Sequence, residues 1–600
     1  MWLCDRLLLL IGRNGFEMPD GARASARDGS VLDGKVWATS YASLEDNERR
    51  HALLVRFPTT VSPAGLELRK EGRTARIAEA QLARGTTDLR SLLRRHLAAL
   101  DESARRRFLS MIVDGVHEEL ADTASYSLAA HLNQIRDALR PQLDARVRTR
   151  HDRQTVQVER ILGIDERSFW VRGWGVDRSG GDLRVELMSP EGHRVSLDSA
   201  HRHARPDVDL FFAGADAPKL GVETGVKHGF VSYFELPSPS LISSGWIAEL
   251  RDPGGNGVEQ LAPPLETDLP AVRAGIMTDI KDFGDLEVED ELLCSHVHPA
   301  LTRLQERLRS STLADTVMQY GDAVASPHVS VIVPLYGRID FMEHQLCQFM
   351  HDSEFRDLDL MYVLDSPELG DQLANAAAAL HSLYELPFRT VVLNRNAGYS
   401  IANNIGASLA RGRLLVLLNS DVVPDLPGWV GRLASFYDAT PGIGALGPKL
   451  LYEDASLQHA GLYFDRRPGT TVWTNLHYYK GLRGDFEPAN VSRPVPAVTG
   501  ACLMIARSTW EEMGGLRCDF VQGGYEDSDL CLRLLEAGRD NWYLAHVELH
   551  HLEDQSFPAG ARLMATAYNE WLQTHLWGEQ IEQLMSDGRF QIEAVALSAE

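Results

Sequence analysis

The sequence has little that would tie it to a membrane or to a disulfide-stabilised scaffold. The N-terminal apolar run from Leu7 to Ile11 is far too short to span a bilayer, which takes about 20 residues, and Asp5 precedes it where a signal peptide is basic. The six cysteines are scattered without paired short spacings, which argues against a disulfide framework or a zinc ribbon. We therefore expect reduced thiols and no transmembrane segment, in a protein that is cytoplasmic or associates peripherally with the inner membrane.

Positive charge is also scarce. The chain has 60 Lys and Arg against 84 Asp and Glu, a formal net charge of -24. Such a surface repels nucleic-acid backbones and anionic lipids, so no nucleic-acid partner is expected. If the ligand carries phosphates, a cation should bridge them to the protein.

The length of 600 residues exceeds what one hydrophobic core normally supports, so several domains are expected. Changes in composition and periodicity predict five parts: a β-rich N-terminal segment (1–85), a helical segment (86–150), a β-sandwich-like domain (151–265), a partly helical linker (266–326) and an α/β domain (327–590). Trp170, Trp174 and Trp246 of the sandwich could stack on sugars, but tryptophans in a sandwich more often belong to its core.

After Pro327, short apolar strands alternate with helices. The strands VSVIVPLY, LMYVLD, FRTVVLN and LLVLLN are apolar throughout, which is typical of a parallel sheet covered on both faces. Ligands of such sheets gather beyond the carboxyl ends of the strands. The chemistry should therefore lie where these strands end.

Three polar motifs follow predicted strands or open predicted helices. Asn419-Ser420-Asp421 directly follows LLVLLN, although such a run often only caps a turn. Asp527 opens an amphipathic helix, in which Asp529 is expected to pair with Arg533 one turn on. His550 and His551 end a predicted strand, so one ring should face the site and one should face away, and a neutral imidazole could join Asp421 on a divalent cation.

Several ordered stretches carry a resemblance to one enzyme family. They are VSVIVPLYGR, LMYVLDSPELG, NRNAGYSIANNIGASLARG, LLVLLNSDVVP, VPAVTGACLMIAR, GGYEDSDLCLR and HLEDQS. In this order, the region from about Pro327 to Phe557 resembles glycosyltransferase family 2. The resemblance implies an α/β fold class, with a GT-A type, mostly parallel sheet flanked by helices in the C-terminal domain, preceded by the sandwich-like domain and the helical segments.

The same resemblance implies roles for individual residues. The nucleotide-sugar donor would be bound by Pro334, Tyr336, Asp365, Asn396, Gly398, Asn403, Asn404, Asn419 and Ser420. The acceptor side would include Thr499, Gly500 and Glu526, and Asp527 would be the catalytic base. Asp421 and His551 would bind Mg²⁺ or Mn²⁺, with His551 favoured over His550.

The function implied is metal-dependent sugar transfer with inversion, from a nucleotide sugar to a glycan or lipid-linked acceptor. Bacterial surface polysaccharide synthesis is the expected setting. One alternative is an inactive carbohydrate-binding or scaffolding protein, because Gly337 and Ser366 depart from the family pattern of the donor loops. Sugar nucleotidyl transfer is a further alternative, but VPLYGRIDF is poor in the glycines and basic residues of a phosphate loop.

Two other patterns invite a different interpretation. Gly442 to Gly447 fit GxGxxG, yet they follow a predicted helix and lead into a strand, whereas a dinucleotide-binding turn needs a strand, the glycines and then a helix. Cys294, His296 and His298 resemble a metal cluster but have no fourth ligand nearby in sequence, so packing in the linker is expected.

Overall fold

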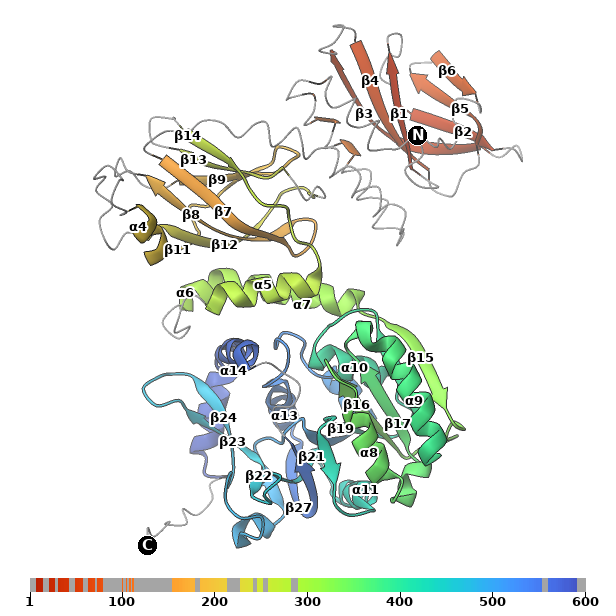
Figure 1. The fold of residues 1–600 in the computed structure, drawn as a ribbon, viewed down its shortest axis with the longest axis vertical. Coiled ribbons are helices and arrows are strands. Elements are labelled where there is room, and N and C mark those ends of the chain that lie inside the picture. Colours follow the sequence, from red (N-terminus) through yellow and green to blue (C-terminus); the bar gives the residue numbers. More distant parts are fainter. Residues whose placement is uncertain are drawn as a thin grey trace. The chain divides into compact units, whose positions relative to one another are not determined.

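The computed structural model describes the strands between residues 7 and 78, a few residues between 100 and 112, and residues 154–177, 184–212, 227–240, 245–251, 257–281, 290–552 and 559–590. The chain forms two compact units (Figure 1). The first comprises Met1–Gly275 with Cys294–Ala300, and the second comprises Ile276–Leu293 with Leu301–Glu600.

The N-terminal part of the first unit is a six-stranded sheet of order β1-β4-β3-β2-β5-β6 in which all neighbours are antiparallel. Its strands are β1 (Leu7–Arg13), β2 (Gly21–Ala26), β3 (Val31–Ala42), β4 (Arg49–Arg56), β5 (Pro63–Lys70) and β6 (Arg73–Ala78). The helical segment expected over 86–150 lies almost entirely outside the described residues.

Two four-stranded antiparallel sheets follow, of order β10-β9-β13-β14 and β11-β12-β8-β7. Their elements are β7 (Gln154–Gly163), β8 (Ser168–Asp177), β9 (Arg184–Met188), β10 (Arg194–Ser196), β11 (His201–His203), α4 (Pro206–Phe212), β12 (Gly229–Glu235), β13 (Ile247–Arg251) and β14 (Gly257–Leu261). Apolar side chains of both sheets share one core, in which Phe169 packs 5.0 Å from Trp246, ring centre to ring centre. Trp170 and Trp246 have no exposed surface, so neither can stack on a sugar.

The helices after the sandwich are α5 (Leu269–Lys281), α6 (Asp290–Leu292) and α7 (His298–Ser311), with a π-helical turn at Leu293–Val297. In that turn, His296 accepts a hydrogen bond from the Tyr233 amide at 3.3 Å, and its other ring nitrogen lies 3.0 Å from the Ser199 carbonyl. Both ring nitrogens therefore serve packing within the first unit. No helix in the described part of the chain is long and apolar enough to cross a membrane.

The second unit is built on an eleven-stranded mixed sheet of order β15-β18-β17-β16-β19-β26-β21-β27-β20, to which β22 and β25 are added. Its strands are β15 (Ala314–Tyr320), β16 (Val329–Leu335), β17 (Asp359–Leu364), β18 (Phe388–Leu393), β19 (Leu414–Leu418), β20 (Val422–Pro424), β21 (Ile443–Leu451), β22 (Leu457–His459), β25 (Arg493–Val495), β26 (Cys502–Ala506) and β27 (Asp540–His551), with a separate hairpin of β23 (Leu462–Arg466) and β24 (Trp473–His477). The four strands β18, β17, β16 and β19 are mutually parallel, and β21 is parallel to β27.

The sheet begins before the boundary expected at residue 327. β15 lies within the stretch that the sequence assigned to a linker, and it pairs antiparallel with β18 at the edge of the sheet. Because an edge strand can stay exposed on both faces, β15 lacks the apolar run that marked the other strands.

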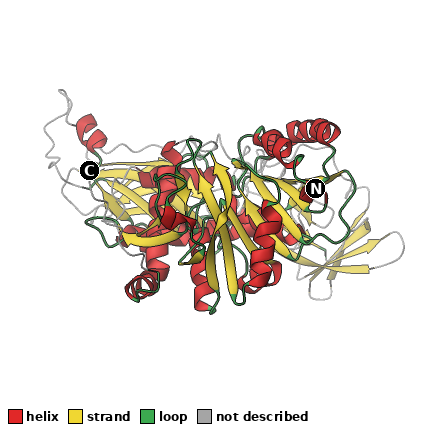
Figure 2. Cartoon of the chain, turned by 90° about the horizontal axis from the view of Figure 1, so that it is seen from below, coloured by secondary structure: helices red, strands yellow, loops and turns green. Residues whose placement is uncertain are grey.

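Helices cover both faces of this sheet (Figures 1 and 2). They are α8 (Phe341–Phe349), α9 (Gly370–Tyr384), α10 (Tyr399–Leu409), α11 (Trp429–Ala439), α12 (Arg507–Met513), α13 (Glu526–Glu536) and α14 (Ala559–Ser586). Along β16, Val331 and Val333 join a cluster that includes residues of α8, α9 and α11, whereas Ile332 joins one that includes residues of α10 and α13. Burial on both faces explains why the strand is continuously apolar.

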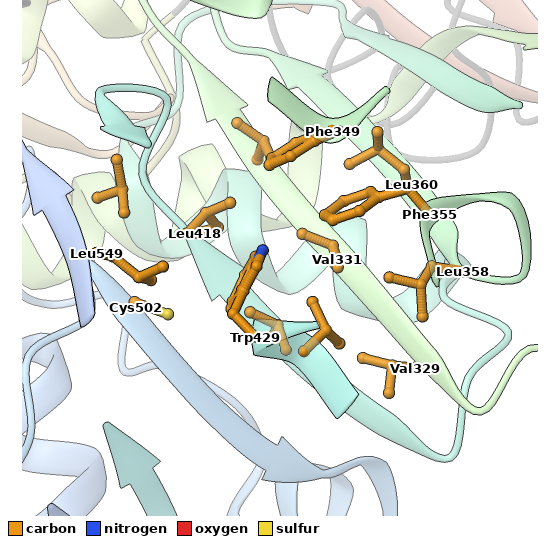
Figure 3. Packing of buried hydrophobic residues seen from close by; sticks show 14 of the residues in the cluster. Val329, Val331, Phe349, Phe355, Leu358, Leu360, Leu418, Trp429, Cys502 and Leu549 are labelled. Carbon is orange, nitrogen blue, oxygen red and sulfur yellow. The ribbon is translucent and has the colours of Figure 1, made fainter. Parts of the chain in front are cut away.

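The first of these clusters contains stacked aromatic rings (Figure 3). Phe349 of α8 and Phe355 lie 3.9 Å apart between ring centres, and Trp429 at the start of α11 packs 6.2 Å from Phe355. All three side chains are fully buried. The cluster fixes α8 and α11 beside the strand ends from which the polar loops leave.

Candidate active site

The loop that contains Asp421 is placed by strand pairing. Asn419 follows β19 directly, and its amide donates to the Ala501 carbonyl at 2.9 Å. β20 then pairs antiparallel with β27, and this register sets Val422 opposite His551. As a result, the Asp421 Oδ1 and His551 Nε2 atoms lie 3.3 Å apart, and both side chains are largely buried.

The two histidines at the end of β27 face different ways. The Nδ1 atom of His551 lies 2.7 Å from the Gln458 amide nitrogen, in a buried contact with β22. His550 instead contacts Asp425 Oδ2 at 2.9 Å and the Tyr452 carbonyl at 3.1 Å. Only His551 shares a contact with Asp421, because neighbouring residues of a strand point to opposite faces.

The buried side-chain amide of Gln345 holds the Asp421 loop in place. The Gln345 side chain of α8 donates to the carbonyls of Asn419 and Val422, both at 2.9 Å. The Asn419 Oδ1 atom is buried and has no hydrogen-bond partner among the described residues. Asp421, His551 and Asn419 thus supply oxygen and nitrogen donors of the kind that bind Mg²⁺ or Mn²⁺. No group of three or more His, Cys, Asp or Glu side chains suited to a metal ion occurs within the described ranges.

The acid pair at the start of α13 is held by backbone amides. Asp527 accepts hydrogen bonds from Gly500 N on Oδ2 and Ser528 N on Oδ1, each at 2.7 Å. Burial raises the pKa of Asp527 despite these bonds and a further one from the Thr499 hydroxyl, which favour its charged form.

The neighbouring Glu526 is buried, and its Oε2 atom has no hydrogen-bond partner among the described residues. Burial first, and the charge of Asp527 second, raise the pKa of Glu526 to about 8. The pair therefore favours a state in which Asp527 is charged and Glu526 keeps its proton, because two adjacent buried carboxylates repel each other.

Gly500 connects the acid pair with two other motifs. Its amide contacts Asp527, its carbonyl accepts from the Tyr399 hydroxyl at 2.8 Å, and the next residue, Ala501, holds Asn419. A Cβ atom at Gly500 would lie 3.2 Å from the Tyr399 hydroxyl and 3.4 Å from Asp527 Cβ, which is a tight fit. The small residue therefore allows three sequence-distant segments to meet.

Asp365 anchors the loop that precedes α10. Its Oδ1 atom accepts from Ala397 N at 2.6 Å, and its Oδ2 atom accepts from Gly398 N at 2.8 Å and from the Asn396 amide at 2.9 Å. Gly398 has φ 100°, in a region that favours glycine. These contacts lead directly to Tyr399, the first residue of α10, and so connect the Asp365 strand end to Gly500.

Other residues predicted to bind the donor lie at different places. Pro334, Tyr336 and Ser420 are half-buried at or just beyond strand ends. In contrast, Asn403 is fully buried and donates to the Tyr399 carbonyl within α10, and the Asn404 amide donates to and accepts from the Leu516 backbone. These contacts lie within α10 and with Leu516, and donor binding by the two asparagines stays a prediction.

Three further site residues were not predicted from the sequence. Gln345 lies within α8 and Gln458 within β22, and Tyr399 is the first residue of α10. Neither glutamine carries a local signal, because its partner lies about 75 to 95 residues away in sequence. The Tyr399 position after Gly398 could have been noticed, since it opens the helix beside the expected donor loop.

The GxGxxG pattern belongs to the sheet. Ile443 to Gly447 lie in β21, where a Cβ atom at Gly447 would be 2.8 Å from Val498 Cβ. These glycines allow close packing of neighbouring segments and do not form a turn between a strand and a helix.

Part of this domain is similar in sequence to known proteins. Residues 330–498 match the model of glycosyl transferase family 2. The chain is 29% identical over 234 residues to the uncharacterized protein y4gI of Sinorhizobium fredii (strain NBRC 101917 / NGR234), covering 38% of this chain and 25% of that protein. It is 27% identical over 257 residues to the O-antigen biosynthesis protein RfbC of Myxococcus xanthus, covering 41% of this chain and 19% of that protein. The chain thus spans only about a quarter or a fifth of these relatives.

Two solved structures show weaker similarity. GalNAc-T7 with UDP, GalNAc and Mn²⁺ is 14% identical with a TM-score of 0.34, covering 43% of this chain and 50% of that one. The mannosyltransferase PcManGT of Pyrobaculum calidifontis, in complex with GDP-Man and Mn²⁺, is 15% identical with a TM-score of 0.28, covering 53% of this chain and 91% of that one.

The mixed sheet, with polar loops at its strand ends, forms an α/β domain. Within this domain, residues 330–498 are thus similar to glycosyl transferase family 2.

Proposed function

We propose that this domain moves a sugar from a nucleotide-sugar donor to a hydroxyl group of a glycan or lipid-linked acceptor, with inversion at the anomeric carbon. The observation that carries the proposal is the convergence at residues 500 and 501. Gly500 N contacts Asp527, and the Ala501 carbonyl holds the loop of Asp421. A base and a cation-binding carboxylate are thus tied to adjacent backbone groups.

In this proposal Asp527 is the catalytic base. The Gly500 and Ser528 amides fix its carboxylate, which retains lone pairs to accept the proton of the acceptor hydroxyl. The acceptor oxygen forms a bond to the anomeric carbon as the bond from that carbon to the donor phosphate oxygen breaks. The raised pKa of Asp527 makes it a stronger base than an exposed aspartate.

Asp421 and His551 would bind Mg²⁺ or Mn²⁺, with Asn419 Oδ1 as a further buried donor. When bound, the cation would neutralise the charge that grows on the departing nucleoside diphosphate. Two close protein ligands suit a cation whose other ligands are water and substrate phosphates. This requirement also agrees with the net charge of -24, since a phosphorylated donor needs a bridging cation.

The acceptor-side residues and the setting are part of the same proposal. The Gly500 amide and the Thr499 hydroxyl donate to Asp527, so these two residues and the adjacent Glu526 would face the acceptor. Bacterial surface polysaccharide synthesis fits the similarity to a part of an O-antigen biosynthesis protein. A cytoplasmic protein, or one that associates peripherally with the inner membrane, would meet both nucleotide sugars and lipid-linked acceptors.

The test uses the purified full chain with a panel of nucleotide sugars, and measures release of nucleoside diphosphate with Mn²⁺, with Mg²⁺ and with a chelator. We expect metal-dependent release from at least one donor. Asp527→Asn should lower turnover by about 10² to 10⁴ with donor affinity retained, because only the proton acceptor is lost. The exposed Asp425 gives a matched control, Asp425→Asn, which should keep wild-type turnover.

Near-normal turnover by Asp527→Asn would remove this residue from the role of base. Donor binding without release from any nucleotide sugar would favour the alternative of an inactive carbohydrate-binding protein.

A further inference from the structure

The buried face of α14 presents polar side chains to the segment that carries the acid pair. Asn569, Glu570, Gln573 and Trp577 all contact residues between 521 and 529, and Asn569 and Gln573 have no exposed surface. Buried polar groups on a helix require specific partners, since an unsatisfied one is costly. α14 also lies beyond residues 330–498, the part that matches the family.

The segment before the acid pair has an unusual backbone. Gln522, Gly523, Gly524 and Tyr525 have φ values of 64°, 130°, 102° and 78°. Two of these four consecutive residues are not glycine, and a left-handed conformation is unfavourable for them. Such a conformation persists only where the surrounding structure imposes it.

Asn569 supplies that constraint. Its Oδ1 atom accepts from Val521 N at 2.9 Å, and its Nδ2 group donates to the carbonyls of Val521, Gly523 and Gly524 at 3.1, 3.4 and 3.0 Å. The orientation of the amide is unambiguous, because one end faces an N–H group and the other faces carbonyls. The Asn569 side chain thus hydrogen-bonds to backbone groups of Val521, Gly523 and Gly524.

Three neighbouring residues of α14 extend the contact past the acid pair. The Tyr525 hydroxyl donates to Glu570 at 2.7 Å, and the Ser528 hydroxyl donates to Gln573 at 2.6 Å. Trp577 donates to Asp529 at 2.9 Å. Glu526 and Asp527 are therefore flanked on both sides by residues bonded to α14.

We propose that α14 positions the acid pair for catalysis and that Asn569 is its central positioning residue. Asn569 acts through the backbone of residues 521–524 and touches neither substrate nor cation. The inference rests on the proposed role of Asp527 as the base. Displacement of a reacting group by about 1 Å can cost about 10²-fold in rate, so loss of this hold should affect turnover more than donor binding.

The test compares Asn569→Ser with Thr574→Val in the full chain. Serine is too short to reach the three carbonyls and adds no buried charge. Thr574 lies on the same helix, but its hydroxyl accepts from Trp473 N at 2.8 Å and is therefore directed to β24. The measurements are kcat, the dissociation constant of the donor, thermal stability, and hydrogen exchange of the amides of residues 521–528.

For Asn569→Ser we expect kcat to fall by about 10- to 100-fold with the donor dissociation constant unchanged, and exchange at residues 521–528 to become faster. Thr574→Val should change neither. Unchanged kcat and unchanged hydrogen exchange in Asn569→Ser would overturn the proposal. An equal loss of kcat in Thr574→Val would also overturn it, because the loss would then come from weaker packing of the whole helix.

A second variant covers the case in which Asn569→Ser does not fold. Glu570→Gln keeps an acceptor for Tyr525 but places an amide group opposite Arg467, which pairs with Glu570. It should produce a smaller change in the same direction, and wild-type kcat and exchange would count against the proposal. If Asp527→Asn turns over normally, the proposed base is wrong, and the exchange data alone decide whether α14 holds the segment.

Discussion

Asp421 Oδ1 and His551 Nε2 lie 3.3 Å apart, whereas the neighbouring His550 contacts Asp425 on the other side of the strand. This difference gives a matched pair of variants. His551→Ala should weaken Mn²⁺ binding by at least about 10-fold, since even the loss of an outer-shell partner has that effect, and His550→Ala should not. Titration of the purified protein with Mn²⁺, followed by electron paramagnetic resonance, measures both. Equal affinities in the two variants would mean that His551 is not a ligand.

Gln458 should control which nitrogen of His551 carries the proton. A neutral His551 that binds a cation through Nε2 carries its proton on Nδ1. The Gln458 side-chain amide lies 2.7 Å from Nδ1. With this amide turned by 180°, its oxygen accepts a hydrogen bond from the Nδ1–H group. Gln458→Leu should therefore weaken Mn²⁺ binding by about 10- to 100-fold. Gln458→Glu keeps an acceptor and should bind Mn²⁺ more tightly than the leucine variant. The reverse order in the same titration would contradict this role.

Glu526 should make stability depend on pH. Its pKa is about 8 in the folded protein against 4.5 ordinarily, so the folded state retains a proton that the unfolded state releases. The free energy of unfolding should fall as pH rises from about 4.5 to about 8, by up to about 1.4 kcal/mol per pH unit from this group. Glu526→Gln removes this contribution. Chemical denaturation of both proteins across this pH range should show a difference that grows with pH, and a constant difference would mean that Glu526 does not titrate there.

The buried pair of Asp359 and Arg389 should be important for stability. Two hydrogen bonds of 3.0 and 2.7 Å join them, and Asp359 also accepts from the Ser330 hydroxyl at 2.7 Å. Asp359→Ala leaves the guanidinium buried without its partner and should lower the free energy of unfolding by about 3–5 kcal/mol. Urea denaturation measures this loss. The exposed pair Arg483 and Asp485 is the control, because solvent screens this ion pair and Asp485→Ala should leave the free energy of unfolding nearly unchanged.

Much of the C-terminal domain could be predicted from local sequence. Strands buried on both faces read as apolar runs, and Asp421 was expected where one of them ends. The pair of Asp529 and Arg533 followed from helical spacing, and the structure confirms it with Nε to Oδ2 at 2.8 Å. In each case the partner or the environment lies within a few residues or within one regular element.

Predictions that needed distant partners were less complete. The Asn404 amide bonds to Leu516, 112 residues away, a contact that no local pattern indicates. β15 was assigned to a linker because an exposed edge strand has no apolar run. Asn569 carried no signal at all, since a single asparagine in an amphipathic helix is usually on its solvated face.

The sequence by itself determined which side chains stand at the ends of strands and the starts of helices, because hydrophobic periodicity and the positions of glycine and proline are local properties of the chain. It therefore determined the fold class of the C-terminal domain and the candidates Asp421 and Asp527. Only the tertiary structure decided which residues contact these candidates. The register of β20 against β27 selects His551, and the docking of α14 fixes the backbone before Glu526. Both depend on contacts between segments far apart in the chain, whose partners no local pattern specifies.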